Sequence, residues 1–151
     1  MSVPRRAGFT MVELLVVIVV LGVLAAIVVP AASVVHAQAS ASSAAGDLAV
    51  VLRWAQARAQ VRAVHVRVTV AADGSYSVSD QTGGEGCVCR QGSLGASACS
   101  SNYPGSAVEF SPAGWPAAAG SSVPRAGSFV FTRGKATSRV VLQLTGCVRC
   151  P

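Results

Sequence analysis

An apolar run near the start of the chain, MVELLVVIVVLGVLAAIVV at residues 11–29, decides how the rest of the sequence is interpreted. Its nineteen residues include a single charge, Glu13. In a helix the run reaches roughly 28 Å, which is close to the hydrocarbon thickness of a bilayer. The sequence therefore predicts a membrane-spanning helix with one carboxylate near its beginning, and an acid in such a place usually marks function or a partner.

A short polar leader, MSVPRRAG at residues 1–8, precedes the run and contains two arginines. Positive charge on this side predicts a cytoplasmic N-terminus and a head that crosses the membrane. A secretory signal has the same basic-then-apolar order, and the alanines at 31–32 offer a cleavage site for one. The length of the apolar run, Gly8 at the end of the leader and the acid at Glu13 favour a retained segment instead.

The composition agrees with a partly membrane-embedded chain. Of 151 residues, 52% are hydrophobic and only 12% are charged, and the mean hydropathy is +0.54. A soluble domain usually has about a quarter charged residues. The formal net charge is +6, and it falls to +4 when the two leader arginines are removed. This excess tolerates an anionic partner without identifying one.

The stretch GFTMVELL at residues 8–15 resembles the type III signal of type IV prepilins and type II secretion pseudopilins. The resemblance implies that a dedicated membrane peptidase cuts between Gly8 and Phe9 and that the new N-terminal Phe9 is methylated. Glu13 then becomes the fifth mature residue. Pro30 becomes the twenty-second, where many pilins also have proline, and it is expected to kink the helix.

The same resemblance implies a role for the helix in assembly. The apolar segment spans the inner membrane first and later packs against the same segment of other subunits in a filament, which lies in the periplasm or outside the cell. Glu13 is expected to pair with the N-terminal amine of a neighbouring Phe9, because a buried carboxylate is tolerated chiefly when it is paired. The simpler alternative is a solvated Glu13 near the lipid headgroups. The implied partners are other pilin or pseudopilin subunits, the prepilin peptidase and the membrane.

The helix is expected to continue from about Phe9 to about Arg62, with residues 9–30 as its transmembrane and polymerisation part. Residues 31–63 form an amphipathic second part that lies on a globular head. A weak stretch at 40–46 offers a place to bend. The apolar positions of the second part fall on one helical face: Leu48, Val51, Leu52, Ala55 and Ala59.

Residues 64–151 are expected to form a β-rich head, which makes the chain an α+β protein with the type IV pilin fold: a long N-terminal helix packed on a small antiparallel sheet. Alternating valines at 64–70, with a turn at 72–74, predict a first hairpin. A short strand is expected at 108–110, and a closing hairpin at 128–144. The Cys-, Gly- and Ser-rich segment 80–106 is predicted to be an irregular loop, and Trp115 is predicted to cap the core.

Two further segments resemble the GspH/FimT group of minor pilins and pseudopilins: AQARAQVRAVHVRVTV at 55–70 and SFVFTRGKATSRVVLQLTGCVR at 128–149. The middle of the chain, 80–127, shows no such resemblance. FimT-like members of the group are linked with DNA uptake through a Gly-Arg-x-Arg ending. Here the corresponding residues 146–149 keep the glycine and the last arginine but have cysteine in place of the first arginine.

The closing hairpin carries basic residues and, from Phe129 to Pro151, no acid. Such a patch can bind DNA phosphates without reading the base sequence. The alternative is an ordinary solvated basic face. The candidate DNA-binding residues are Arg133, Lys135, Arg139 and Arg149.

All five cysteines follow the apolar run, in the part predicted to lie outside the cytoplasm, where disulfides persist. Candidate pairs are Cys89 with Cys99 and Cys147 with Cys150, while a long-range bridge is equally allowed. One thiol, Cys87 in this arrangement, is left over. A four-thiolate zinc site is disfavoured because a single residue between Cys87 and Cys89 is too short a spacing. A redox role for the Cys147–Cys150 pair is disfavoured because no helix start lowers a thiol pKa there.

No combination of residues predicts an enzyme, a metal site or a cofactor. The two histidines, His36 and His65, do not have metal-ligand spacing, and the glycines at 83–86 are isolated from any phosphate-binding context. The sequence thus predicts a structural subunit: a minor pilin or pseudopilin of a type IV pilus-like or type II secretion filament. The alternative function is a FimT-like minor pilin that binds DNA for uptake in natural transformation.

Overall fold

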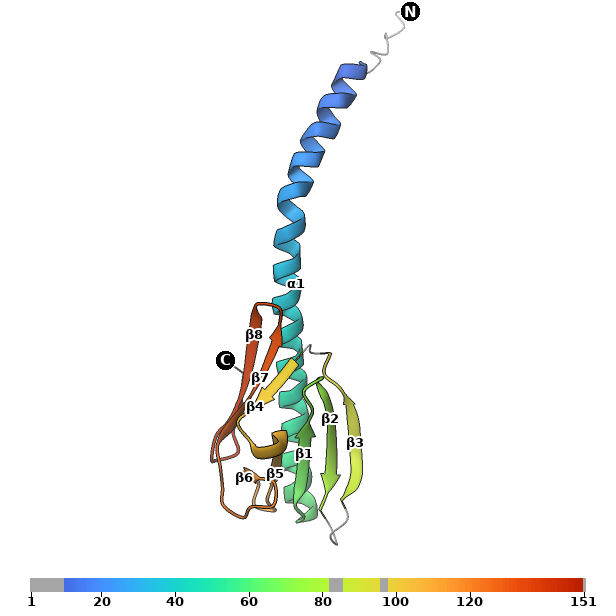
Figure 1. Cartoon of the computed structure of the whole chain (residues 1–151). Helices are drawn as coiled ribbons and strands as arrows, with labels where there is room; N and C mark the ends of the chain where they lie inside the picture. Colours follow the sequence, from blue (N-terminus) through green and yellow to red (C-terminus); the bar gives the residue numbers. More distant parts are fainter. Residues whose placement is uncertain (1–9, 82–85, 96–97, 151) are drawn as a thin grey trace, which may run out of the picture. The chain divides into compact units, whose positions relative to one another are not determined.

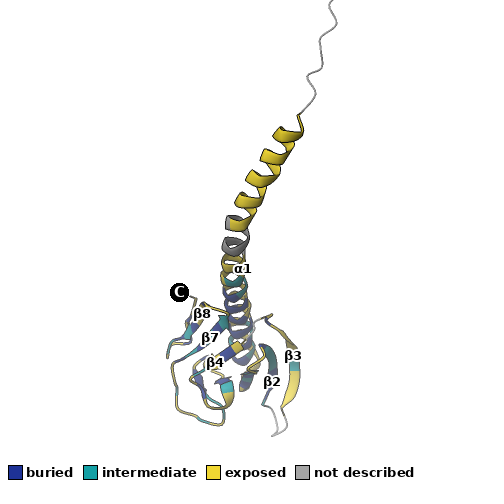
Figure 2. Ribbon diagram, turned by 45° about the horizontal axis from the view of Figure 1, so that its top comes forward, coloured by how far each residue is buried: buried dark blue, intermediate teal, exposed yellow. Residues whose placement is uncertain are grey.

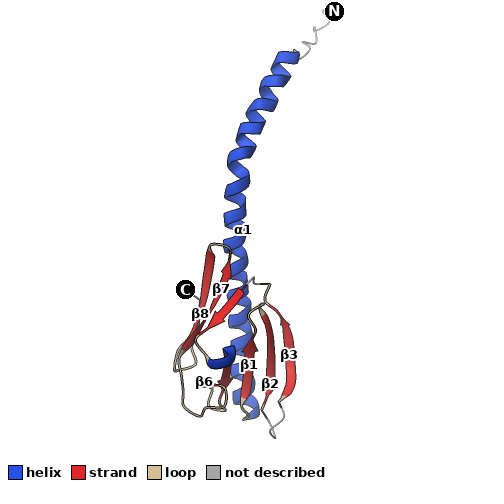
Figure 3. Cartoon of the chain, in the orientation of Figure 1, coloured by secondary structure: helices blue, strands red, loops and turns tan. Residues whose placement is uncertain are grey.

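A single helix, α1 (Met11–Arg62), forms the first part of the described chain (Figure 3). Thr10 lies directly before it, and the backbone N–H of Glu13 donates to Thr10 Oγ1 at 3.3 Å. This is the geometry of a helix N-cap, and Thr10 and Glu13 have the Thr-x-x-Glu spacing of a capping box. The predicted single helix ending near Arg62 is confirmed, and its helical hydrogen bonding continues through Pro30. The kink at Pro30 stays a prediction.

The computed structural model describes residues 10–81, 86–95 and 98–150, without the side chains of 27–32. The predicted leader and the Gly8–Phe9 cleavage site lie outside these ranges. Two compact units are present, Met1–Val35 and His36–Pro151, and each is treated by itself below. The sequence predicts a membrane span over 11–29; among the described residues, the structure contains no helix long and apolar enough to cross a membrane.

The second unit contains two antiparallel sheets (Figure 1). The first has the strand order β3-β2-β1-β5-β6 and the second has the order β4-β7-β8-β9. The strands of the first sheet are β1 (Val66–Val70), β2 (Ser75–Asp80), β3 (Cys87–Ser93), β5 (Ala107–Phe110) and β6 (Pro116–Ala118). Those of the second are β4 (Ala98–Ser101), β7 (Gly127–Arg133), β8 (Ala136–Leu142) and β9 (Val148–Arg149), and a short 3-10 helix, η1 (Pro104–Ser106), precedes β5.

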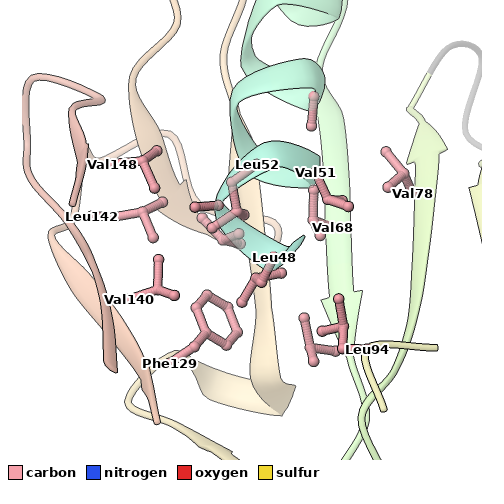
Figure 4. Packing of buried hydrophobic residues seen from close by; sticks show 14 of the residues in the cluster. Leu48, Val51, Leu52, Val68, Val78, Leu94, Phe129, Val140, Leu142 and Val148 are labelled. Carbon is pink, nitrogen blue, oxygen red and sulfur yellow. The ribbon is translucent and has the colours of Figure 1, made fainter. Parts of the chain in front are cut away.

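The core of this unit lies between the helix and the inner faces of both sheets (Figure 4). Leu48 and Leu52 of α1 are fully buried, as are the alternating valines of β1. Phe129, Val140 and Leu142 supply the second sheet's part of the same cluster. The predicted hairpins are confirmed, since β1 pairs with β2 and β7 pairs with β8. One helical stripe therefore serves both sheets.

The segment 80–106 was predicted to be irregular, and this is wrong for much of it. Residues Cys87–Ser93 form β3, which pairs with β2, and Ala98–Ser101 form β4, which pairs with β7. Nearly all side chains of β3 are exposed, so the strand has no apolar alternation to reveal it. Its formation depends on backbone hydrogen bonds to β2, which has buried side chains at Val78 and Asp80.

The prediction that Trp115 caps the core is also wrong, because its side chain is 52% exposed. Tyr103 is buried instead and stacks on Phe129 with ring centroids 5.8 Å apart. Its hydroxyl donates to the carbonyl of Arg125 at 2.8 Å, and burial raises the pKa of Tyr103 to about 12. The hydroxyl of this buried ring is therefore hydrogen-bonded, as is usual for a buried tyrosine.

Truncation of Leu52 tests the shared core. Leu52→Ala should lower the free energy of unfolding by about 3 kcal/mol, because a buried leucine contacts both sheets and a cavity would remain. Val50→Ala is the matched control on the same helix; Val50 is 56% exposed, and its truncation should change stability by less than about 0.5 kcal/mol. Denaturant unfolding of the full chain in detergent measures both. Equal effects of the two substitutions would contradict the described packing.

Candidate functional site

The first unit presents an almost continuous apolar surface (Figure 2). Every large hydrophobic side chain from Met11 to Leu24 is exposed, from 44% for Val17 to 84% for Met11. A shallow groove on this helix is lined by residues at helical spacing: Val12, Leu15, Val16, Val19 and Val20. An apolar surface of this extent on one helix is suited to lipid or to the apolar face of another helix.

Glu13 is the one acid of this surface and lies in the first turn of α1. A carboxylate there is favourable because the N-terminal end of a helix carries a partial positive charge. Phe9, its predicted partner in a neighbouring subunit, lies outside the described residues. The pairing of Glu13 therefore stays a prediction, and the structure contributes the position of the carboxylate at the start of the helix.

A polar cluster joins the end of α1 to the first sheet. Arg58 donates from Nε and Nη2 to the carboxylate of Asp80 at 2.8 and 2.7 Å, and Asp80 is buried. The two hydrogen bonds between Arg58 and Asp80 fix the direction of both side chains. The guanidinium groups of Arg58 and Arg90 each lie over the indole ring of Trp54, at 5.3 and 5.6 Å from the ring centroid. The sequence analysis missed this cluster, although Trp54 and Arg58 have i, i+4 spacing on the helix.

The Arg58 guanidinium holds the pKa of the Asp80 carboxyl below its usual range, and the same contact raises the pKa of Arg58. Burial acts in the opposite direction on both groups, and it is outweighed. Because the folded-state pKa of Asp80 is lowered, the ion pair contributes stability that is present above the ordinary aspartate value of about 3.9. That contribution is lost as the pH falls through the lowered pKa.

A second buried carboxylate, Glu109, organises the outer face of the same sheet. It accepts from Arg67 Nη2 at 3.0 Å and from the backbone N–H of Gly120 at 3.2 Å, and His65 Nδ1 lies 3.1 Å away. These contacts hold the loop after β6 against β5. We therefore assign the cluster a role in positioning this loop.

The candidate DNA-binding residues do not share one surface. Arg133 Nη1 donates to the hydroxyl of Ser40 on α1 at 2.6 Å, so this side chain fastens the closing hairpin to the helix. Arg139 and Arg149 are exposed and lie on the outer face of the second sheet, since Arg149 is paired with Val141, two residues along β8 from Arg139. Lys135 is exposed in the β7–β8 turn.

The five cysteines are free thiols. Cys147 and Cys150 flank the extended strand β9, which places their Cα atoms roughly 10 Å apart. A disulfide tolerates at most about 7 Å. The two side chains also face opposite ways: Cys150 Sγ lies 3.7 Å from the carbonyl of Ala45, whereas Cys147 lies on the other face of the strand. The structure thus keeps this predicted pair apart.

Cys89 and Cys99 are separated as well. Cys99 lies beside the β1–β2 turn, where its N–H donates to the carbonyl of Ala72 at 2.9 Å. Cys89 lies next to Ser79, at the other end of β2. The intervening residues of β2 span roughly 15 Å. Among the residues that the structure describes, no group of three His, Cys, Asp or Glu side chains is placed to hold a metal ion.

Replacement of Asp80 tests the polar cluster. Asp80→Asn should lower the free energy of unfolding at neutral pH by about 2 kcal/mol, because Arg58 would lose a charged partner in a partly buried place. It should also flatten the fall in stability on acidification below about pH 4 that the lowered pKa of Asp80 predicts for the parent chain. The control is Asp47→Asn, an exposed acid of the same helix. Unfolding titrations at several pH values distinguish the two, and parallel pH profiles for Asp80→Asn and the parent would contradict the account.

Comparison with known proteins agrees with this architecture. The family model described as the prokaryotic N-terminal methylation motif matches residues 3–29, and the model described as type II transport protein GspH matches residues 44–146. No curated protein matches the chain significantly by sequence. The two family matches cover both the apolar helix and most of the head.

Two solved structures share the fold. The type IV minor pilin FimU of Pseudomonas aeruginosa has a TM-score of 0.60 and 14% identity, over 74% of this chain and 87% of that one. The minor pseudopilin EpsH from the type 2 secretion system of Vibrio cholerae has a TM-score of 0.58 and 15% identity, over 74% and 96%. The GspH match and these structures agree with a minor pilin or pseudopilin and do not favour the DNA-uptake alternative. The chain belongs to the GspH family of type II transport proteins, and it is a minor pilin or pseudopilin, a structural subunit with the type IV pilin fold.

Proposed function

We propose that the chain is made as a precursor, that the prepilin peptidase cuts it between Gly8 and Phe9, and that Phe9 is then methylated. The mature protein is held in the bacterial inner membrane by residues 9–30, with its head on the periplasmic side. From there it enters a type IV pilus-like or type II secretion filament as a minor subunit. The match of the N-terminal methylation motif to residues 3–29 supports the processing steps.

The observation that carries this proposal is the exposed apolar surface from Met11 to Leu24. At about 25 cal/mol per Å², exposure of so many large aliphatic side chains to water is strongly unfavourable. Bilayer lipid and the helices of other subunits both remove this surface from water. The groove from Val12 to Val20 gives a neighbouring helix a row of sites for its side chains at heptad-like spacing.

In this proposal Glu13 sets the axial position of each helix relative to its neighbours in the filament. A carboxylate inside an apolar helix bundle is costly unless it is paired, and the nearest available cation in an identical or related subunit is the amine of a processed N-terminus. Pairing between subunits then fixes the axial offset of one helix against the next. Glu13 differs in this respect from the buried acids of the head, since Asp80 and Glu109 already accept hydrogen bonds from arginines of the same chain.

Glu13→Gln tests the pairing. The substitution keeps the size of the side chain and its helix-forming tendency but removes the charge, so incorporation into filaments should fall at least about tenfold, as expected for the loss of a paired charge. The measurement is the amount of the variant in sheared or detergent-resistant filaments relative to its amount in membranes. Asp47→Asn removes an acid from the head part of α1 and should leave incorporation unchanged. Normal incorporation of Glu13→Gln would contradict the proposed role.

The processing steps make a separate prediction. Intact-mass measurement of the protein isolated from its own cells should give a chain that begins at Phe9 and is one methyl group heavier than the sequence alone. Cells that lack prepilin peptidase activity should yield the chain with residues 1–8 still attached. A mature chain that begins after the alanines at 31–32 would identify the apolar run as an ordinary signal peptide and would refute the proposal.

A further inference from the structure

Strand β3 contains a bulge at Cys89. Val78 of β2 is opposite Arg90, and Ser79 is opposite Val88, so Cys89 has no partner residue across the ladder. A bulge of this kind bends its strand locally and redirects a side chain. Cys87 is back in the ladder, opposite Asp80.

The bulge brings the side chain of Cys89 back toward Cys87. The Cys89 thiol donates to the carbonyl oxygen of Cys87 at 3.2 Å. That carbonyl belongs to Cys87, so the sulfur of Cys89 lies close to the backbone of the residue that carries the second thiol. Both residues also adjoin Asp80, Cys87 through the strand register and Cys89 through an interaction with the carboxylate. Both cysteines thus lie beside Asp80 on the same edge strand.

The other three cysteines are placed elsewhere. Cys99 is buried in the second sheet and is separated from Cys89 by most of the length of β2. Cys147 and Cys150 flank β9, which is the edge strand of that second sheet. Strand β3 is an edge of the first sheet, so neither C-terminal cysteine is a neighbour of it in either ladder.

We propose that Cys87 and Cys89 form a disulfide with each other, and that this bond closes the bulge of β3. The pairing differs from both pairs suggested by cysteine spacing alone. Cys87 and Cys89 are two residues apart on one extended strand, which places their Cα atoms roughly 7 Å apart, at the upper limit for a disulfide. Closing the bond therefore requires a local change in the β3 backbone at the bulge, and it leaves the strand order of both sheets unchanged. The site is accessible, since Cys87 is exposed at the edge of the sheet.

The reaction is thiol–disulfide exchange with a small or protein disulfide donor, such as oxidised glutathione. The thiolate of Cys87 attacks one donor sulfur, the donor's S–S bond breaks, and the first donor thiolate leaves and takes up a proton. The Cys89 thiol then loses its proton to water and attacks Cys87 Sγ, which releases the second donor thiol. Two protein thiols are oxidised and one donor disulfide is reduced.

The order of the two attacks follows from the surroundings. Burial raises the pKa of the Cys89 thiol, and the negative charge of the nearby Asp80 carboxylate acts in the same direction. Cys89 therefore has less thiolate and reacts second, whereas Cys87 is exposed and meets the donor first. The Arg58–Asp80 ion pair does not contain either sulfur and remains after the bond has formed.

Trypsin digestion provides a direct test, because cleavage after arginine and lysine separates the thiols. Residues 68–90 form one peptide that contains both Cys87 and Cys89. Cys99 falls in the peptide 91–125, Cys147 in 140–149 and Cys150 in 150–151. The purified full chain in detergent is equilibrated with oxidised glutathione, its free thiols are alkylated at acidic pH, and the digest is analysed by mass spectrometry without reduction.

The expected result is an unalkylated peptide 68–90 that is two hydrogens lighter than its sequence mass and that takes up two alkyl groups only after reduction. Cys99→Ser should leave this result unchanged, and Cys87→Ser should abolish the mass loss. Recovery of 68–90 with two alkyl groups before reduction would overturn the inference. So would its recovery cross-linked to 91–125, 140–149 or 150–151.

The geometry of this pair does not depend on the proposed function. Formation of the bond in cells does rest on it, because the proposed function places the head in the oxidising periplasm. The same digest of protein taken from acid-quenched cells distinguishes the two claims. A bond that forms in the purified chain and is absent in cells supports the inference and contradicts the proposed location. A bond that fails to form in the purified chain overturns the inference and leaves the proposed function standing.

Discussion

The head of this protein depends on the packing of one helical stripe against two sheets. The stripe consists largely of alanine, with Ala44, Ala45, Ala49, Ala55 and Ala59 all buried. Such small side chains allow the inner faces of both sheets to approach the helix closely, and Leu48 and Leu52 fill the space that remains. Among the described residues, the large buried apolar side chains of both sheets belong to one cluster with this stripe. The second part of α1 is therefore a required part of the head and not a stalk to which an independent head is attached.

Polar contacts then fix how the sheets lie on that stripe. Arg58 binds Asp80 at the end of β2, and Arg53 donates to the carbonyl of Val148 on β9 at 3.1 Å. Arg133 reaches Ser40 from the closing hairpin. Each of these arginines comes from a position that is polar in the sequence pattern, and each acts inside the chain. Part of the basic composition is therefore used in contacts within the chain.

Much of this arrangement could be predicted from the sequence, for identifiable reasons. The first part of the helix is a continuous apolar run, and its second part and the β1–β2 and β7–β8 hairpins have apolar residues at regular spacing, so these elements could be recognised from the sequence. Strand β3 could not be predicted in this way because nearly all of its side chains are exposed, although it pairs with β2, the strand directly before it. Strand β4 has only four residues, and it pairs with β7, which is distant in sequence. The exposure of Trp115 and the burial of Tyr103 could not be predicted either, because both lie among turn residues, where tertiary contacts decide burial.

The same distinction, between features set by local sequence and features set by tertiary structure, applies to the candidate functional residues. Gly8, Phe9 and Glu13 are defined by a contiguous motif, which sequence alone can recognise. The disulfide pairs Cys89–Cys99 and Cys147–Cys150 depend on three-dimensional separation, and the extended strands β2 and β9 hold those pairs apart. The Cys89 bulge has no sequence signature, since it is a shift in pairing between two strands and not a property of either one.

The central claim is that the apolar face of α1 meets the same kind of helix in other subunits. A photoreactive amino acid placed at Val16, inside the groove from Val12 to Val20, tests this in cells most directly. The account predicts covalent products with other pilin or pseudopilin subunits, which should disappear when Glu13→Gln is introduced into the same chain. Cross-links to lipid alone, with filaments assembled normally, would contradict the claim.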